Sequence, residues 1–512
     1  MGKHSAVTEF QFVDGHAIQK WYSSSPAHPV PILHLKNFFR RMTGYDGISP
    51  VKAHQKIVSL DVLDIRYPTV RLGMAGSDPR HLAPNYSCAM PVLRTDGGLE
   101  GRSLIFTIGD GTQIQVAAVE ALRRFVVGRT IEEFIAEPGL FAQALTEHHQ
   151  LRWLALGAYR MAVGGVINAL WDLWAKSEGV PMWRLLLSLP PERIVQCIDF
   201  HHLRDVLTED ELLGMLQERE AAKARNIERL QCEGLRVYST AGWSGRPLSE
   251  VRELCGALYA QGTRAFKAKV GRGQQYDRAR ALREDRRMLD TIRSATGPDA
   301  LLLTDANQNL GDWRNAASYM TELAEYKLLF IEEAIAYNDV MGYAKLREAL
   351  QPVGIGVAGG EQAPDAVTFK QLLAGGGLTH CQIDGARVGG VNELFAIVAM
   401  SAKFGVPVCP HSGGIGLGQL VGAMSIFDQA WFGSEGRWLE YLEFLQAGVF
   451  KHPLVVRNGH WMLPDAPGWG LEMEEEFVTR YRYPGGPDCA NSEEADRVAA
   501  AQPGAPPYVR FW

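Results

Sequence analysis

The 512-residue sequence has little cysteine, no large excess of charge of either sign and no long hydrophobic run. Its seven cysteines are scattered and odd in number, which excludes a disulfide framework or a cysteine-rich zinc site. A formal net charge of −6, without a dense Lys/Arg run, excludes the basic surface that nucleic-acid binding requires. These absences favour a globular protein of a reducing compartment.

The chain also lacks membrane and secretion signals. No apolar run is long enough to span a bilayer, and the first residues, MGKHSAVTEF, lack the apolar core of a secretory signal. We therefore expect no membrane partner and a cytoplasmic location, and we expect a homo-oligomer. Residues 1–55 mix polar residues with proline, which buries little surface and predicts a mobile or loosely docked extension. A targeting or oligomer-docking role is the alternative for this segment.

Two different patterns of hydrophobic residues follow the extension along the chain. Strands followed by helices predict an α+β domain over residues 56–195. Beyond it, eight apolar runs alternate with amphipathic helices: GLRVYSTAG, AFKAKVG, LLLTDAN, LLFIEEA, GVAGGE, HCQIDGAR, VPVCPHSG and RWLEYLE. Eight such units in about 220 residues favour a (β/α)8-type barrel, assigned to residues 196–455, over an open doubly wound sheet. The tail, residues 456–512, is expected to pack on the α+β domain and complete it as a capping domain. The predicted fold class is therefore α/β.

Polar residues gather where the predicted barrel strands end. The residues at these ends are Lys267 and Lys269, Asp305 and Asn307, Glu332 and Glu333, Glu361, Asp384, His411 and Glu440, in the order of strands two to eight. Each of them alone has a simpler explanation, such as a helix cap or a solvated charge. Because the carboxyl ends of parallel strands meet at one mouth of a barrel, we expect these side chains to converge there.

The residue types at these strand ends indicate a particular chemistry. Asp305, Glu332 and Glu361 form a set of hard oxygen ligands that suits Mg²⁺ rather than zinc. Lys267 and Lys269 point the same way on a strand, and crowding of two ammonium groups predicts a lowered pKa and a neutral amine base. Asp384 and His411 lie on adjacent strand ends and predict a carboxylate–imidazole pair. Such a set is suited to proton removal next to a carboxylate.

At these residues the chain resembles the enolase superfamily in its mandelate racemase branch, and most closely the L-fuconate and L-galactonate dehydratases. The resemblance covers roughly residues 57 to 485. Its motifs, in chain order, are GSD at 76–78, FTIGDG at 106–111, INALWDLWAK at 167–176, CIDF at 197–200, KAKVG at 267–271, DANQ at 305–308, FIEE at 330–333, CQIDGARVGGVNE at 381–393 and VCPHSGG at 408–414.

The resemblance implies a hydro-lyase that acts on a small acid sugar. It implies that the three carboxylates bind Mg²⁺ and that Lys269 removes the proton next to the substrate carboxylate, which the metal stabilises. It further implies that His411, held by Asp384, protonates the departing 3-hydroxyl, which leaves a 2-keto-3-deoxy sugar acid. The residues implied as substrate contacts are Gly76, Ser77, Asp78, Tyr86, Lys267, Asn307 and Glu440.

Departures from the family pattern leave the substrate open. The loop after GSD reads PRHLAPNYS, and Gln419 stands where a Glu is usual. L-fuconate and L-galactonate are the first candidates. A racemase or epimerase of a 2-hydroxy acid would use the same Lys and His without losing a hydroxyl. A non-catalytic binding or regulatory protein is the third hypothesis, and the complete set of strand-end charges argues against it.

Overall fold

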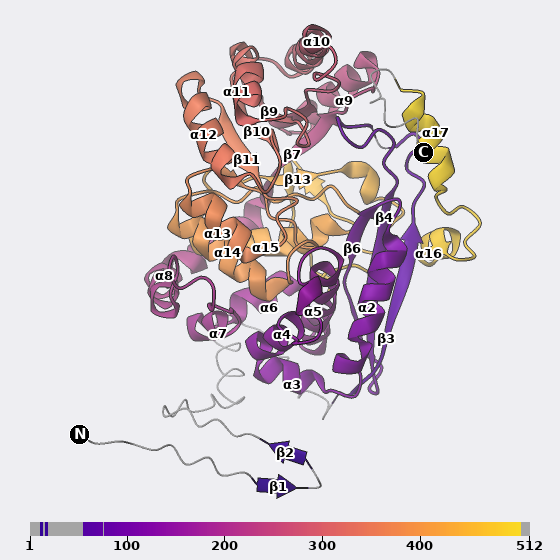
Figure 1. Cartoon of the computed structure of the whole chain (residues 1–512), viewed down its shortest axis with the longest axis vertical. Helices are drawn as coiled ribbons and strands as arrows, with labels where there is room; N and C mark the ends of the chain where they lie inside the picture. The colour runs from indigo at the N-terminus through magenta and orange to yellow at the C-terminus, as the bar shows by residue number, and fades with distance from the viewer. Residues whose placement is uncertain (1–10, 14–15, 19–54, 75, 503–512) are drawn as a thin grey trace. The chain divides into compact units, whose positions relative to one another are not determined.

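The computed structural model describes residues 11–13, 16–18, 55–74 and 76–502, and Figure 1 shows the course of the chain. The chain forms two compact units, residues 1–49 and residues 50–512, each of which is described by itself. In the first unit, β1 (Gln11–Val13) and β2 (His16–Ile18) form an antiparallel hairpin. The predicted extension covers residues 1–55; apart from this hairpin and Gln55, it lies outside the described residues. No helix of the described part combines the length and hydrophobicity needed to cross a membrane.

The second unit begins with an antiparallel sheet. Its strands are β3 (Ile57–Arg66), β4 (Tyr86–Thr95), β5 (Glu100–Arg102), β6 (Ile105–Ile108) and β16 (Arg482–Tyr483). The order is β16-β3-β4-β5, and β6 pairs with β4. α2 (Thr112–Val126) runs along this sheet (Figure 1) and buries Val119, Leu122 and Val126 at helical spacing. The tail strand β16 thus joins a sheet whose other strands, β3 to β6, come from the beginning of the second unit.

One buried helix joins this sheet to the rest of the unit. α5 (Ala158–Ser177) is buried almost all round, as expected of a helix that is apolar on every face. Its Asn168 donates to the carbonyl of Gly385 at 3.2 Å, and its Trp171 indole donates to Asn392 at 3.0 Å. The shorter helices around it are α3 (Ile131–Ala136), α4 (Pro138–Thr146), α6 (Met182–Ser188) and α7 (Pro191–Gln196). α5 therefore holds the capping sheet against the barrel.

The barrel strands follow one another in space as they do in the sequence. They are β7 (Leu235–Gly242), β8 (Ala265–Lys269), β9 (Leu301–Asp305), β10 (Leu328–Glu332), β11 (Gly356–Gly359), β12 (His380–Cys381) and β13 (Leu439–Tyr441). All pair in parallel from β7 to β12, and β13 pairs in parallel with the other side of β7. In place of the seventh predicted strand, a single parallel bridge joins Val408 to Cys381. Among the described residues, no ladder joins Val408 to β13.

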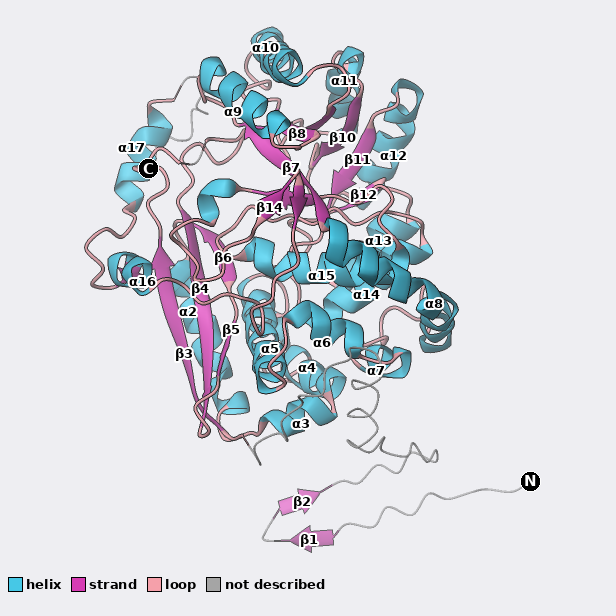
Figure 2. Ribbon diagram, turned by 180° about the vertical axis from the view of Figure 1, so that it is seen from behind, coloured by secondary structure: helices cyan, strands magenta, loops and turns pink. Residues whose placement is uncertain are grey.

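Helices surround these strands (Figure 2). They are α8 (Glu209–Glu233), α9 (Leu248–Ala260), α10 (Arg278–Thr296), α11 (Trp313–Thr321), α12 (Val340–Leu350), α13 (Ala366–Ala374), α14 (Val391–Lys403) and α15 (Leu417–Phe432). The tail adds the hairpin β14 (Val456–Arg457) and β15 (His460–Trp461), then α16 (Glu475–Tyr481) and α17 (Ser492–Ala500). The strand–helix alternation predicted from the sequence is therefore present.

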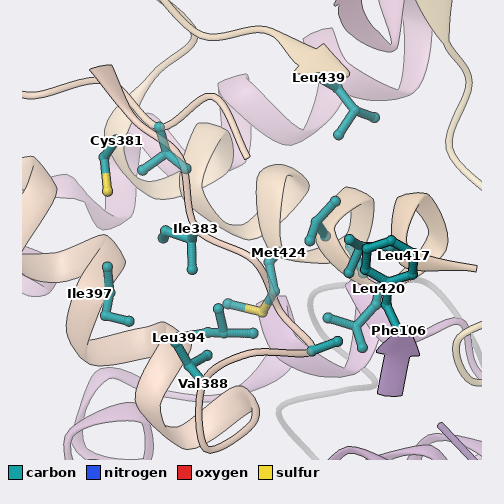
Figure 3. Close-up of a cluster of buried hydrophobic side chains, with 14 of the residues drawn as sticks. Phe106, Cys381, Ile383, Val388, Leu394, Ile397, Leu417, Leu420, Met424 and Leu439 are labelled. Atoms are coloured by element: carbon teal, nitrogen blue, oxygen red, sulfur yellow. The ribbon is translucent and has the colours of Figure 1, made fainter. Parts of the chain in front are cut away.

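Two apolar cores support the barrel. One lies among the strands and consists of Tyr238, Ala265, Leu303, Phe330 and Ala358. The other fills the space between strands and helices, and Figure 3 shows side chains of α14 and α15 gathered there with Ile383 and Phe106. Because Phe106 comes from β6, the capping sheet contributes directly to the core of the barrel.

Candidate active site

The charged side chains stand directly above the inner core because side chains on a strand repeat with period two. Asp305 follows the core residue Leu303 by two positions, and Glu332 follows Phe330 in the same way. Register places Lys269 beside Asp305 and Asp305 beside Glu332 on the paired strands. The strand ends therefore carry their polar residues to one mouth, as the sequence predicts.

Asp305, Glu332 and Glu361 come together as a buried cluster of carboxylates. Their ligand oxygens lie within 4.8 Å of one another, and all three side chains are buried. Burial raises the pKa of Glu332 to about 8, and the neighbouring Asp305 charge adds to this effect. Glu332 Oε1 has no hydrogen-bond partner among the described residues, although buried oxygens usually have one. Three hard oxygen donors with an unsatisfied atom fit a divalent cation such as Mg²⁺.

Two buried lysines lie against these carboxylates. Lys267 Nζ is 2.8 Å from Glu332 Oε2 and 2.8 Å from Glu440 Oε1. Lys269 Nζ donates to Asp305 Oδ2 at 2.5 Å and to Asn307 Oδ1 at 3.1 Å.

The predicted lowering of a lysine pKa is wrong in this arrangement. Burial and the charge of Lys267 do lower the pKa of Lys269, but the adjacent Asp305 carboxylate outweighs them and raises it. The prediction considered only the two ammonium groups, whereas the nearest charge to Lys269 is a carboxylate on the next strand.

Asp384 and His411 form a close pair on the other side of the cluster. His411 Nδ1 lies 2.9 Å from Asp384 Oδ2, and His411 Nε2 lies 3.6 Å from Glu361 Oε2. The amides of Ala386 and Arg387 donate to Asp384 and fix its orientation. Burial lowers the pKa of His411, but the charges of Glu361 and Asp384 outweigh burial and raise it to about 9. The imidazole is therefore protonated near neutral pH and is suited to act as an acid.

Glu440 is held by three groups at the last strand end. Thr240 Oγ1 donates to Glu440 Oε1 at 2.6 Å, the Ser412 amide donates to Oε2 at 3.0 Å, and Lys267 pairs with it. Burial raises the pKa of Glu440, but the charge of Lys267 outweighs it, so the pKa is lowered. The carboxylate is therefore ionised in this site.

The backbone at two strand ends adopts a conformation that is rare for side-chain-bearing residues. Asn307, Gln308 and Glu333 have φ values of 43°, 62° and 39°. Strain of this kind persists where the surroundings enforce it, and it concentrates at functional sites. Gln308 Nε2 donates to Glu333 Oε2 at 2.9 Å, which holds the two loops together. Asn307 is thereby turned toward Lys269 rather than continuing the strand.

The predicted capping-domain contacts lie over the same mouth. Ser77 and Asp78 are both buried, and Gly76 lies so close to the Trp243 side chain that an added Cβ would be 2.0 Å from the Trp243 Cβ. Asp78 Oδ2 lies 2.9 Å from His81 Nδ1. The Tyr86 ring stacks on Phe106 with 5.8 Å between ring centres, and the Phe106 ring centre is 6.3 Å from that of His411. Burial raises the pKa of Tyr86, and the charges of Asp78 and Glu440 add to this effect. The structure therefore brings every sequence-predicted site residue to one region.

Three residues near the site were not predicted from the sequence. Trp243 follows β7 and presents its ring 4.9 Å from Lys269 Nζ, a cation–π distance. Thr240 follows the core residue Tyr238 by two positions, so period two could have identified it. His81 gave no local signal, because only the folded loop sets it against Asp78.

Comparisons with known proteins place this site in a family. The sequence pattern described as "Enolase C-terminal domain-like" matches residues 250–477. The Homo sapiens protein named mitochondrial enolase superfamily member 1 is 39% identical over 438 residues, which cover 84% of this chain and 96% of the relative. L-galactonate dehydratase of Hypocrea jecorina is 40% identical over 428 residues, covering 82% of this chain and 93% of the relative.

Solved structures show the same fold. The crystal structure of human mitochondrial enolase superfamily member 1 matches with a TM-score of 0.81 and 39% identity, and covers 85% of this chain and 98% of that one. L-talarate/galactarate dehydratase from Salmonella typhimurium LT2, liganded with Mg and L-lyxarohydroxamate, matches with a TM-score of 0.63 and 21% identity, covering 86% and 95%. At that identity the likeness concerns the fold alone. The predicted fold, a barrel with an N-terminal capping domain, is confirmed, and the chain belongs to the enolase superfamily.

Proposed function

We propose that this chain is a Mg²⁺-dependent acid-sugar dehydratase. The observation that carries the proposal is the order of groups around the mouth: Lys269, the three carboxylates Asp305, Glu332 and Glu361, and then the Asp384–His411 pair. A base on one side and an acid on the other side of a cation site is what elimination of water next to a carboxylate requires. The L-galactonate dehydratase relative at 40% identity supports this class of substrate.

Asp305, Glu332 and Glu361 would hold the cation. When bound, Mg²⁺ supplies positive charge that neutralises these oxygens and the substrate carboxylate, and so eases proton loss at the adjacent carbon. Asp305 is a proposed ligand of the cation, whose charge would offset the carboxylate that raises the pKa of Lys269. In the proposed reaction the neutral Lys269 Nζ takes the C2 proton, and the C3–O bond breaks as the electron pair moves into a C2–C3 double bond. His411 Nε2 gives its proton to the departing hydroxyl, which leaves as water. The resulting enol tautomerises to a 2-keto-3-deoxy acid.

Other residues hold the substrate and the acid in place. Asp384 keeps the His411 ring oriented and favours its protonated form through the 2.9 Å contact. Glu440, Lys267 and Asn307 line the inner wall of the mouth, and Ser77, Asp78 and Tyr86 cover it. We propose that these residues contact the substrate, with Lys267 and Glu440 orienting its carboxylate end. We further propose the domain assignment given above, with residues 56–195 and the tail capping residues 196–455.

A substrate panel tests this function. The purified protein with Mg²⁺ should convert an aldonate, with L-galactonate and L-fuconate tested first, to a 2-keto-3-deoxy acid that forms a semicarbazone. EDTA should abolish the reaction and added Mg²⁺ should restore it, because the carboxylate cluster then regains its cation. A complete lack of turnover on every aldonate and aldarate by the Mg²⁺-loaded protein would contradict the proposal.

A second measurement separates dehydration from racemisation. In D2O, His411→Asn should still exchange the C2 proton of a substrate while losing dehydration, because Lys269 is unchanged. If His411→Asn loses exchange as well, the assignment of base and acid is wrong. If the wild type inverts C2 without releasing water, the racemase alternative replaces the dehydratase.

A further inference from the structure

The loop that carries Ser77 and Asp78 is held from several directions. We define the capping loop as residues 76–82. Inside the loop, the Asp78 carboxylate accepts from the amides of Arg80 and His81 at 2.7 and 2.5 Å, which forms a tight turn. On the barrel side, Ser77 Oγ donates to the carbonyl of Ser244 at 2.6 Å. Arg80 also donates to the carbonyls of Asn307 and Gln308 at 3.4 and 3.5 Å. The loop thus has its own turn, a bond near the end of the first barrel strand and two long bonds near the end of the third.

A further attachment comes from Arg272 and Gln502, to which the sequence analysis gave no role. Arg272 Nη1 donates to Ser77 Oγ at 2.8 Å, and Arg272 Nη2 donates to Gln502 Oε1 at 2.5 Å. Gln502 Nε2 then donates to the carbonyl of Leu82 at 2.5 Å. These hydrogen bonds therefore hold the capping loop near both of its ends, at Ser77 and at Leu82.

Gly245 leaves room for the side chains of Ser77, Arg272 and Gln502 to meet. A Cβ at this glycine would lie 3.3 Å from Ser77 Oγ, 3.4 Å from Arg272 Nη1 and 3.8 Å from Gln502 Oε1. Gly245 also has a φ of +80°, which favours glycine. The three side chains therefore meet above a position that carries no side chain of its own.

Arg272 and Gln502 each lie next to an element that is held in place by other contacts. Arg272 lies three positions after Lys269, so its backbone position is fixed by β8, the strand that carries the proposed base. Gln502 follows α17, which buries none of its residues and lies beside the end of the β3–β4 pair in Figures 1 and 2. Polar contacts hold α17 there: the Ser492 hydroxyl donates to the Asp110 carboxylate, and the Ala490 amide donates to the Arg66 carbonyl at 2.9 Å.

Arg272 depends on these partners. No carboxylate lies within ion-pair distance of its guanidinium among the described residues, and its buried Nε has no hydrogen-bond partner there. Ser77 and Gln502 are therefore the groups that satisfy it. A guanidinium with two fixed donors is a rigid spacer between two acceptors, which an ammonium would not be.

We propose that Arg272 and Gln502 are positioning residues that hold the capping loop over the barrel mouth. The proposal rests on the proposed function for its effect on substrate, since Ser77 and Asp78 contact substrate only if the mouth is the active site. Neither residue takes part in the chemistry. Their loss should loosen the loop, raise KM and leave kcat nearly unchanged, because the Ser77–Ser244 bond and the Lys269 site remain.

The first experiment measures loop order without substrate. In the full-length protein, amide hydrogen exchange of residues 77–82 should become roughly fivefold to tenfold faster in Gln502→Leu and Arg272→Met, since each loses hydrogen bonds of modest net strength. The matched controls are Gln261→Leu, at the exposed residue directly after α9, and Arg283→Met, at an exposed position of α10, and both should leave exchange unchanged. If exchange in the loop is the same in Gln502→Leu, Arg272→Met and the two controls, the proposal is overturned.

The second experiment measures catalysis. Gln502→Leu should raise KM about tenfold with kcat within about twofold of wild type, and Arg272→Lys should not rescue the effect of losing the guanidinium. A fall in kcat at constant KM would overturn the positioning role. If Arg272→Met does not fold, Gln502→Leu alone decides. If the wild type turns over no acid sugar, the proposed function fails while the exchange experiment still decides whether Arg272 and Gln502 hold the loop.

Discussion

Lys267 at the barrel mouth and Lys223 on α8 are equally buried lysines in opposite surroundings. Their exposed fractions are 1% and 0%. Burial lowers the pKa of both, but in Lys267 the charges of Glu332 and Glu440, each 2.8 Å away, outweigh burial and raise it well above its usual value. Lys223 has no carboxylate within ion-pair distance among the described residues and keeps a lowered pKa.

The two regions show how a folded chain tolerates a buried charge. Lys223 Nζ lies 4.1 Å from the centre of the Trp431 ring and 3.4 Å from the carbonyl of Leu187, which are weak substitutes for water. Lys267 belongs to a dense group of charges in which every member compensates another. Burial alone therefore does not mark a functional charge, whereas convergence of opposite charges at strand ends does.

The largest expected effect is the difference in kcat between loss of a lysine at the barrel mouth and loss of the buried lysine on α8. Lys269→Ala should lower kcat about 10³-fold or more, because it removes the proposed general base. Lys223→Met, also at a buried lysine, should keep kcat within about twofold, since α8 lies outside the mouth. Steady-state kinetics on the best acid sugar measures both. Retention of a tenth of the activity by Lys269→Ala would assign the base to another residue.

The next effect concerns stability at the mouth. Lys267→Met should lower the free energy of unfolding by about 3–5 kcal/mol, because it leaves Glu332 and Glu440 as unpaired buried carboxylates. Denaturant unfolding in a buffer without divalent cations measures this change. The double variant Lys267→Met/Glu332→Gln should recover part of the loss. A cost below about 1 kcal/mol would show that the cluster does not depend on this ion pair.

Asp285 extends the comparison to a buried acid that has no cationic side chain within ion-pair distance among the described residues. It accepts at one oxygen from the Gly271 amide at 2.9 Å and the Tyr319 hydroxyl at 2.6 Å, and burial raises its pKa to about 7. The folded state thus holds the proton more tightly than the unfolded state, whose pKa is near the usual 3.8. The stabilising contribution is complete below pH 4 and is lost as the pH rises through 7.

Asp285→Asn should remove this pH dependence, because an amide keeps an acceptor oxygen for both donors. Relative to wild type, the variant should gain about 1–2 kcal/mol of stability at pH 8 compared with pH 5. Unfolding curves of both proteins from pH 4 to pH 8 test this. Parallel curves over the whole range would mean that Asp285 stays ionised throughout.

The smallest effect is expected at Lys223. Lys223→Met should leave the free energy of unfolding at pH 7 unchanged or raise it by up to about 1 kcal/mol, since an apolar chain of similar length replaces a poorly compensated charge. Because the folded pKa is lowered, wild-type stability should rise with pH toward 10.5, and the variant should lack this rise. A loss above about 2 kcal/mol would show that the contact with Trp431 outweighs the cost of burial.

Much of the barrel could be predicted because its strands are short apolar runs with polar residues at their ends. LLLTDAN and LLFIEEA became β9 and β10, and their last residues are Asp305 and Glu332. The sequence predicts the seventh strand, VPVCPHSG, from the same pattern, yet within the described part of the chain only Val408 of this segment forms a β-bridge. Whether a segment pairs along its whole length depends on backbone hydrogen-bond geometry with the neighbouring strand. The hydrophobic pattern of the sequence does not predict that geometry.

Contacts between distant segments could not be predicted. Gly76 against Trp243, and Arg272 against Gln502, each join parts of the chain more than a hundred residues apart. No local pattern announces such a pair, because each residue alone is an ordinary loop or tail residue. The pKa of Lys269 was wrongly predicted for the same reason, since Asp305 approaches it from another strand.

The sequence by itself determined the strand–helix alternation, the positions of Asp305, Glu332 and Glu361, and the pairing of Asp384 with His411. These follow from periods of two and 3.6 and from the rule that parallel strands end at one mouth. Only the tertiary structure decided the charge state of Lys269, the cation–π contact of Trp243 and the attachment of the capping loop to Arg272 and Gln502. Those properties depend on distances between side chains from different elements, and electrostatic and hydrogen-bond energies are set by distance and burial rather than by order along the chain.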